Sequence, residues 1–206
     1  MKDANAVLAV VRSMPDYVTS FEKAFPEDKD PVAFDNVGEA IGAFERGLVT
    51  PSRWDRYLLG DKTALVDAEK KGARVFMETG CANCHNGAYL GGGTLQKLGV
   101  FAPWPNQKDQ GRFEATKQEA DRMMFKVPSL RNVARTGPYF HDASARNLRD
   151  PIIEMARLQL GKELAPSDVR LIAIFLSSMT GVVPVDYVKE PALPRSTDRT
   201  PKPDAT

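Results

Sequence analysis

The chain has 206 residues, a formal net charge of +1, and 42% hydrophobic and 27% charged residues. This length can bury the core of one domain, or of one domain and part of another. The near-neutral charge produces no electrostatic field that would attract nucleic acid or an anionic membrane. The longest apolar run near the start, residues 6–11, is too short for a signal-peptide core or a membrane span. We therefore expect neither nucleic acid nor a membrane as a partner.

Three stretches of the chain have the periodicity of a helix. Apolar residues recur at three- and four-residue spacing in residues 34–48, 63–79 and 166–180. Such spacing predicts amphipathic helices, and each stretch is followed within three residues by a proline or a glycine that ends a helix. Thr63 is the expected N-cap of the second helix. No segment alternates apolar and polar residues as a strand does, so we predict an all-α fold.

Segments rich in glycine and proline separate these helices. Residues 91–93 are three consecutive glycines, and residues 102–105 contain two prolines around a tryptophan. Both segments are predicted to be loops. From Pro184 onward the chain contains five prolines and many charged residues but little apolar surface to bury. We expect residues 184–206 to form an extended or disordered tail.

The sequence Cys81-Ala-Asn-Cys84-His85 is the C-x-x-C-H motif that attaches a haem covalently. Its two thiols lie one helical turn apart, so both can form thioether bonds to the vinyl groups at one edge of a porphyrin. His85 can then bind the iron. The chain has only these two cysteines, so no disulfide framework is expected. The motif predicts one covalent c-type haem, attached through Cys81 and Cys84, with His85 as its proximal ligand.

Three other interpretations of the same cysteines fit less well. A dithiol redox motif has the same spacing but is expected between strands and helices of a βαβ unit, whereas helical patterns flank this motif. A structural zinc site needs four ligands, and Cys81, Cys84 and His141 supply three. His85 is an awkward fourth ligand because it is the immediate neighbour of Cys84. A structural disulfide leaves the histidine unexplained.

Ordered motifs on both sides of the haem motif carry a resemblance to a known family. They are residues 80–92, 96–99, 109–112, 125–133, 137–142, 154–161 and 175–181, together with Ser13-Met14-Pro15 and Ala24-Phe25-Pro26 near the start. In this order they resemble the C-terminal haem domain of the bacterial dihaem cytochrome c peroxidases. The resemblance covers nearly the whole chain except the tail.

This resemblance implies an organisation of the chain into three parts. Residues 1–62 are expected to be a helical segment similar to the end of the family's first haem domain and its linker. Residues 63–183 are expected to be a cytochrome c-like haem domain with long loops, and residues 184–206 the tail. Family members carry two C-x-x-C-H motifs, whereas this sequence contains one. The other motif is expected in an N-terminal haem domain that is missing from this chain.

The resemblance also implies a function. The expected haem accepts electrons from a small soluble donor, a monohaem cytochrome c or a copper protein, and passes them to the missing haem, where hydrogen peroxide is reduced to water. Because c-type haem is attached outside the cytoplasm, we expect a periplasmic protein whose signal peptide was lost with its natural N-terminus. Pairing into a homodimer is implied as well. The alternative is a stand-alone monohaem electron carrier in the periplasm without peroxidase activity.

An electron-transfer iron needs a second axial ligand, and methionine is the ligand that raises its potential. Spacing alone allows Met124, and the resemblance implies Met155 as the distal ligand. A relative that matures a quinone cofactor has tyrosine at the position of Met155, which disfavours that activity here. His141 is either an iron ligand or, as we prefer, a histidine that forms hydrogen bonds within its own turn.

Four further residues are candidates for contacts with charged groups. Arg131 and Arg135 are candidates to neutralise the haem propionates. Thr136 and Pro138 match positions whose backbone carbonyls help to hold a calcium ion between the two haem domains of the family, and carbonyl oxygen is a ligand that suits calcium. Such an ion is expected to be weakly held here, because the side-chain ligand comes from the missing domain.

Overall fold

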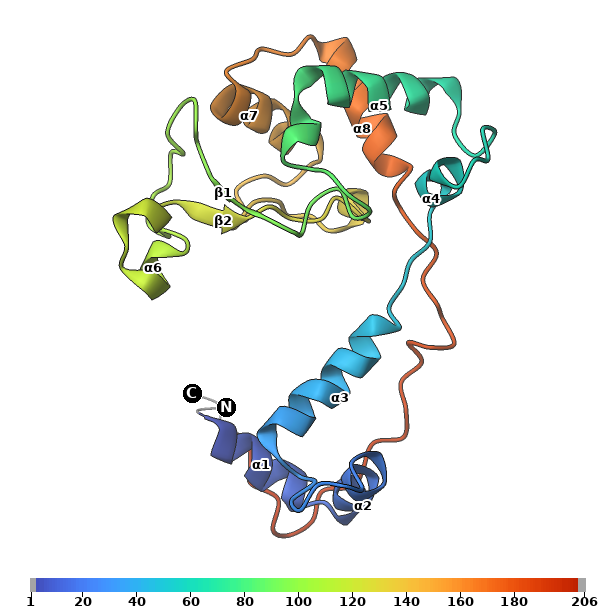
Figure 1. Ribbon diagram of the computed structural model, residues 1–206, viewed down its shortest axis with the longest axis vertical. Helices are drawn as coiled ribbons and strands as arrows, with labels where there is room; N and C mark the ends of the chain where they lie inside the picture. The colour runs from blue at the N-terminus through green and yellow to red at the C-terminus, as the bar shows by residue number, and fades with distance from the viewer. Residues whose placement is uncertain (1–2, 204–206) are drawn as a thin grey trace. The chain divides into compact units, whose positions relative to one another are not determined.

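The computed structural model describes residues 3–203 (Figure 1). The chain divides into two compact units. One unit contains the described residues up to Val49 together with those from Val183 onward, and the other is Thr50–Val182. Most of the regular structure is helical, as the periodicity predicts. Within residues 3–203, no helix combines the length and the apolar character needed to cross a bilayer.

The first unit contains three helices, α1 (Ala4–Arg12), α2 (Pro15–Ala24) and α3 (Phe34–Arg46). Asp3 caps α1, because its carboxylate accepts a hydrogen bond from the N–H of Ala6 at 2.9 Å. Pro15 begins α2, at a position where a backbone N–H would have no hydrogen-bond partner within the helix. α3 ends two residues before the expected residue 48, because the chain turns at Gly47.

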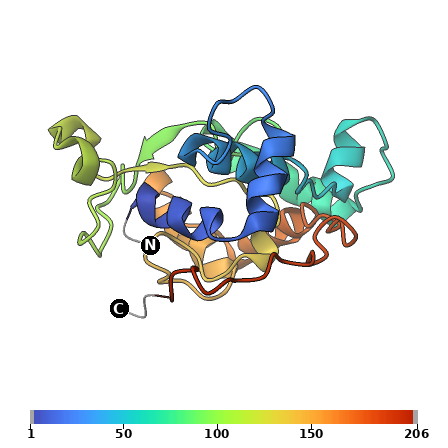
Figure 2. The ribbon, with the colours of Figure 1, turned by 90° about the horizontal axis from the view of Figure 1, so that it is seen from below.

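The tail from Val183 onward belongs to the same unit. The Tyr187 ring stacks on Phe44 with a centroid separation of 5.3 Å, and its hydroxyl donates to the Phe44 carbonyl at 2.8 Å. Farther along, the Thr197 hydroxyl donates to the Ser13 carbonyl at 2.9 Å. Residues 183–203 form no helix or strand (Figure 2). This part of the tail is therefore a strap held by side-chain contacts, and the last three residues of the expected tail lie outside the described residues.

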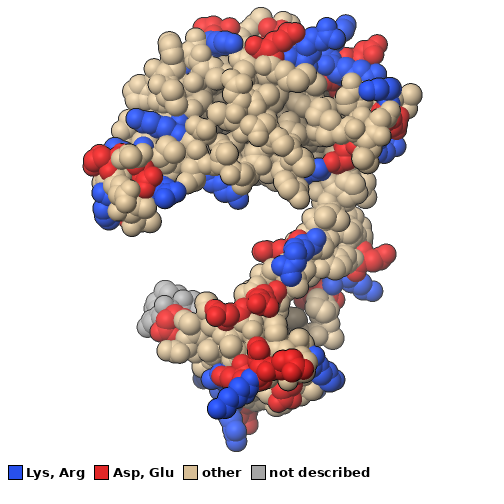
Figure 3. Space-filling view, in the orientation of Figure 1, with Lys and Arg blue, Asp and Glu red and all other residues tan. Residues whose placement is uncertain are grey.

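The second unit contains the other elements. They are α4 (Arg53–Leu58), α5 (Asp67–Thr79), the 3-10 helix η1 (Cys81–Asn83), β1 (Leu95–Lys97), α6 (Phe113–Thr116), η2 (Glu119–Asp121), β2 (Met124–Lys126), η3 (Val133–Arg135), α7 (Arg149–Leu160) and α8 (Pro166–Ser177). α5 and α8 lie side by side, and their apolar faces form the main core (Figure 1). Acidic and basic side chains are interspersed on the face shown in Figure 3, in keeping with the net charge of +1.

The close approach of α5 and α8 depends on Gly72. A β-carbon at this position would lie 2.0 Å from the carbonyl oxygen of Leu171, so the atoms would overlap. Next to this contact the rings of Phe76 and Phe175 lie with their centroids 5.5 Å apart, and both side chains are buried. The absence of a side chain at one position thus allows two large rings to pack at the next turn.

The second predicted helix starts later than expected. It begins at Asp67, and the prediction that Thr63 is its N-cap is wrong. The N–H and hydroxyl of Thr63 donate to the Asp61 carboxylate at 3.0 and 2.6 Å, which makes a separate turn. The helix is capped instead by Glu69, whose carboxylate accepts from the Val66 N–H at 3.0 Å.

The last predicted helix begins at Pro166 as expected but ends at Ser177, before Gly181. Gly181 serves a different purpose. A β-carbon there would lie 2.0 Å from the carbonyl oxygen of Thr50, so the glycine allows two chain segments to meet at the boundary of the unit. Long-range packing therefore explains this glycine better than helix capping does.

The expectation that the chain has no strand is wrong. β1 and β2 pair in antiparallel fashion, with Leu95 opposite Lys126 and Lys97 opposite Met124. Each strand has three residues, which is too short for an alternating pattern to be recognised in the sequence. The two strands make a small ribbon, and the fold remains mostly helical.

Candidate functional site

A cavity of about 600 Å³ lies in the second unit, between the C-terminal end of α5, the β1–β2 ribbon, α7 and α8. Its wall is mostly apolar and includes Phe76, Phe125, Leu130, Ile152, Ile172 and Leu176. A cavity of this size with an apolar wall and a few polar groups is typical of a cofactor site. Cys81, Cys84, His85 and Met155 all line it.

The C-x-x-C-H motif is presented to this cavity by the end of α5. Gly80 has a left-handed backbone, with φ 104°, and ends the helix. The chain then makes one turn of 3-10 helix, in which the N–H groups of Cys84 and His85 donate to the Cys81 carbonyl at 3.3 and 3.0 Å. This turn places the two sulfur atoms and the imidazole at the same cavity. Both thiols are free.

His85 has a defined orientation in the cavity wall. Its Nδ1 lies 3.3 Å from the carbonyl oxygen of Leu90, so Nδ1 carries the proton and Nε2 is left free to bind a metal. Burial lowers the pKa of His85, which favours the neutral imidazole that a metal requires. Gly91 completes this arrangement, because a β-carbon there would lie 2.2 Å from the Pro128 carbonyl oxygen and 3.3 Å from Nδ1.

The environment of Cys81 argues against the dithiol redox interpretation. Burial raises the pKa of the Cys81 thiol to about 11, whereas a redox cysteine needs a lowered pKa to form its thiolate. The zinc interpretation has no support either. Within residues 3–203, no three His, Cys, Asp or Glu side chains lie close enough together to hold a metal ion. The apolar cavity with its four sulfur and nitrogen groups fits a haem instead.

The structure separates the two methionine candidates. Met155, on α7, lies in the cavity wall and also packs beside the buried cluster of Trp104, Met123 and Leu158. Met124, on β2, lies outside the wall, although its neighbour Phe125 belongs to it. This placement favours Met155 as the distal ligand, which remains a prediction.

His141 lies at the exposed edge of the cavity. Its ring stacks on Phe125, with centroids 4.4 Å apart, and lies 5.9 Å from the ring of Trp104. These contacts account for the histidine as part of an aromatic group. Thr136 and Pro138 also line the cavity and are exposed, and their assignment to calcium remains a prediction.

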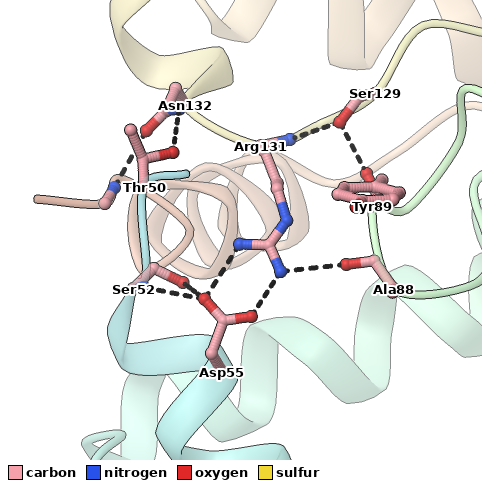
Figure 4. Close-up of polar contacts among 9 residues, drawn as sticks. Thr50, Ser52, Asp55, Ala88, Tyr89, Ser129, Arg131 and Asn132 are labelled. Atoms are coloured by element: carbon pink, nitrogen blue, oxygen red, sulfur yellow. Dashed lines mark hydrogen bonds and ion pairs between the residues drawn. The ribbon is translucent and has the colours of Figure 1, made fainter. Parts of the chain in front are cut away.

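Arg131 is not among the residues that line the cavity, and its guanidinium lies against Asp55 instead (Figure 4), which does not support a contact with the propionates. One nitrogen of its guanidinium donates to the Asp55 carboxylate at 2.8 Å, and the other donates to Asp55 and to the Ala88 carbonyl. The N–H and hydroxyl of Ser52 donate to the same carboxylate at 2.7 Å. The sequence does not predict this ion pair, because nothing near Asp55 in the sequence indicates that its partner lies 76 positions away.

Comparison with known proteins identifies the family. A family model described as di-haem cytochrome c peroxidase matches residues 1–63. The cytochrome c551 peroxidase of Pseudomonas aeruginosa is 46% identical over 196 residues, which cover 93% of this chain and 56% of that protein. The chain belongs to the di-haem cytochrome c peroxidase family. This confirms the family that the sequence motifs predicted.

Another member of the family and one solved structure agree with this family assignment. The cytochrome c551 peroxidase of Nitrosomonas europaea is 45% identical over 195 residues, covering 94% of this chain and 57% of that protein. A crystal structure of a MauG-like protein associated with microbial copper homeostasis matches with a TM-score of 0.69 and 27% identity, covering 87% of this chain and 63% of that chain. This member of the family thus spans slightly more than half the length of the Pseudomonas and Nitrosomonas relatives.

Proposed function

We propose that residues 63–183 are a cytochrome c-like domain that holds one covalent haem and accepts electrons for a cytochrome c peroxidase. The observation that carries this proposal is that one apolar cavity brings together Cys81, Cys84, His85 and Met155. Two thiols, a neutral imidazole and a thioether are the groups that attach a c-type haem and bind its iron. The dithiol, zinc and disulfide interpretations leave at least one of these groups without a role.

Each residue has a separate task in this proposal. The sulfur atoms of Cys81 and Cys84 form the thioether bonds, and Nε2 of His85 is the proximal ligand. The Leu90 carbonyl holds the imidazole in its orientation, and such a partner also makes the other ring nitrogen a stronger ligand. Met155 is the distal ligand, and the apolar wall excludes water. The bound haem supplies one-electron transfer, which amino-acid side chains do not provide here.

Family membership favours the peroxidase over the stand-alone carrier. The names of the Pseudomonas and Nitrosomonas relatives contain both cytochrome c551 and peroxidase. We infer a small soluble donor, a monohaem cytochrome c or a copper protein, whose electrons pass through this domain to a second haem that reduces hydrogen peroxide to water. A second haem of this type needs its own attachment motif, and this sequence contains one motif. An iron bound by both His85 and Met155 has no open position for peroxide.

The proposal extends to the location and assembly of the protein. Attachment of a c-type haem outside the cytoplasm supports a periplasmic location, and membership of the family supports pairing into a homodimer. Calcium held by the backbone carbonyls of Thr136 and Pro138 is a secondary part of the proposal. The support for it is the exposure of these two residues beside the cavity and the suitability of carbonyl ligands for this ion.

The first experiment tests the attachment of haem. The chain is expressed in a host with haem-attachment machinery, and haem is counted by spectroscopy of the denatured protein. We expect one haem per chain, and we expect it to stay with the protein in acidified organic solvent. A Cys81→Ser, Cys84→Ser double variant is the control and should release any haem it binds. Haem that leaves the unmodified chain in this solvent would show that no covalent link exists.

The second experiment separates electron transfer from peroxidase activity. The 206-residue chain is mixed with a reduced monohaem cytochrome c, and oxidation of the donor is followed with and without hydrogen peroxide. We expect rapid exchange of one electron per chain and negligible turnover of peroxide. Turnover at the rate of a complete dihaem enzyme would mean that this chain by itself contains an iron that peroxide can reach.

A further inference from the structure

Gln159, on α7, connects this helix to the end of the β1–β2 ribbon through both ends of its side-chain amide. Its Nε2 donates to the Lys97 carbonyl at 2.8 Å, and its Oε1 accepts from the Gly99 N–H at 2.9 Å. The partners are a carbonyl that can only accept and an N–H that can only donate, so the orientation of the amide is determined. Both bonds join residues at least 60 positions apart in the sequence.

The backbone next to Gln159 reinforces the same junction. The N–H groups of Phe101 and Ala102 both donate to the Leu158 carbonyl, at 3.0 and 3.1 Å. Leu158 itself is buried, with 4% of its surface exposed, in the cluster that it shares with Trp104. The last turn of α7 is therefore held against residues 97–102 by four hydrogen bonds and a buried side chain.

This junction lies one helical turn from the proposed distal ligand. Gln159 follows Met155 by four residues, so the two side chains lie on the same face of α7. Both line the cavity, and so do Lys97 and Leu98 from the segment that Gln159 holds. A methionine side chain has three rotatable bonds and adapts readily to the space around it. Its direction is consequently set by the walls that confine it.

We propose that Gln159 is a positioning residue for Met155. By holding residues 97–99 against α7, it keeps the wall beside Met155 closed and the thioether directed into the cavity. Residues 97–99 cannot move away from α7 without breaking both hydrogen bonds of the Gln159 amide. Such a movement would give the Met155 side chain room to turn away from the iron. This inference rests on the proposed role of Met155 as distal ligand, and it adds a residue that has no chemistry of its own toward the haem.

The test uses the haem-loaded chain with two variants and a control. Gln159→Leu has a similar size but makes neither hydrogen bond, and Gln159→Glu keeps the acceptor for Gly99 while losing the donor to Lys97. Arg157→Gln removes an exposed ion pair with Glu154 on the same helix and serves as the control. Two properties are measured: the near-infrared charge-transfer band of a thioether on ferric iron, and the affinity for added imidazole, which competes with Met155.

We expect Gln159→Leu to weaken the band and to bind imidazole about tenfold more tightly. The reason is that the two hydrogen bonds of Gln159 no longer hold residues 97–99 against α7. Gln159→Glu should lie between this variant and the unmodified chain, and Arg157→Gln should match the unmodified chain. Thermal unfolding is recorded alongside. If Gln159→Leu does not take up haem, the same criteria apply to Gln159→Glu.

A variant that is less stable but keeps an unchanged band and imidazole affinity would overturn the inference, because the role of Gln159 would then be structural alone. That result would leave the ligand role of Met155 intact. If the unmodified chain has no thioether band, or if Met155→Ala retains it, both the ligand assignment and the inference fail. The two failures are thus distinguished by the spectrum of the unmodified chain and of Met155→Ala.

Discussion

Asp55 and Arg131 form an ion pair that joins α4 to the segment before η3, across 76 positions of sequence. About four fifths of each side chain is buried, since their exposed fractions are 23% and 20%. The guanidinium also donates to the Ala88 carbonyl at 3.1 Å. Ala88 belongs to the loop between the haem motif and Leu90, whose carbonyl orients His85. The pair therefore connects the start of the second unit to the loop that orients His85.

Asp55→Asn is expected to lower the free energy of unfolding by about 1–3 kcal/mol, because a largely buried charge-assisted bond is lost and Arg131 is left without its anion. Urea unfolding followed by circular dichroism measures this change. The control is Glu119→Gln, which removes an ion pair with Arg122 in which the side chains are 75% and 39% exposed. The control should lower the free energy of unfolding by clearly less than Asp55→Asn does, because solvent screens an exposed ion pair. Equal losses in the two variants would contradict the prediction.

The same pair makes stability depend on pH in a specific direction. The hydrogen bond from Arg131 holds the pKa of Asp55 well below its usual range. In the unfolded chain the aspartate takes up a proton at about pH 3.9, whereas in the folded chain it stays ionised. The stabilisation from the pair is therefore complete above that pH and declines as the pH falls below it. We expect the stability difference between the unmodified chain and Asp55→Asn to be constant near neutral pH and to shrink below about pH 4. Urea midpoints at a series of pH values test this, and a difference that is undiminished at about pH 3 would refute it.

Gly72→Ala is expected to lower the free energy of unfolding by about 1–3 kcal/mol, because the added methyl group would overlap the Leu171 carbonyl and force α5 and α8 apart. Trp54 and Trp104 both lie in the second unit, so tryptophan fluorescence during urea unfolding reports on this unit. Gly93→Ala is the matched control, since a β-carbon there meets nothing within 4 Å. It should change stability by less than about 0.5 kcal/mol. A neutral Gly72→Ala would mean that the helices can separate at little cost.

Met155→Ala is expected to abolish the near-infrared charge-transfer band of the ferric haem-loaded chain, because the thioether that produces the band is removed. It should also lower the reduction potential and open the iron to added ligands. Met124→Ala is the matched control and should leave the band in place, since Met124 lies outside the cavity wall. The reverse pattern would assign the ligand to Met124.

The five residues of the haem motif could be interpreted from the sequence alone because their chemistry is local. One turn of chain brings Cys81, Cys84 and His85 to the same side, whatever surrounds them. Helices are local in the same sense, since their periodicity reflects contacts three and four residues apart. For this reason the start of α3 at Phe34 and of α8 at Pro166 agree with the prediction.

Contacts between distant parts of the chain were decided only by the tertiary structure. Gln159 and Asp55 look like ordinary polar residues of helices until their partners, 60 or more positions away, are known. The β1–β2 ribbon and the narrow contact at Gly72 likewise depend on a segment from elsewhere in the chain. The physical reason is that a local pattern records only which face of an element is apolar. The packing of the elements determines which distant group bonds to a given carboxylate or amide, and which segment lies against a given glycine.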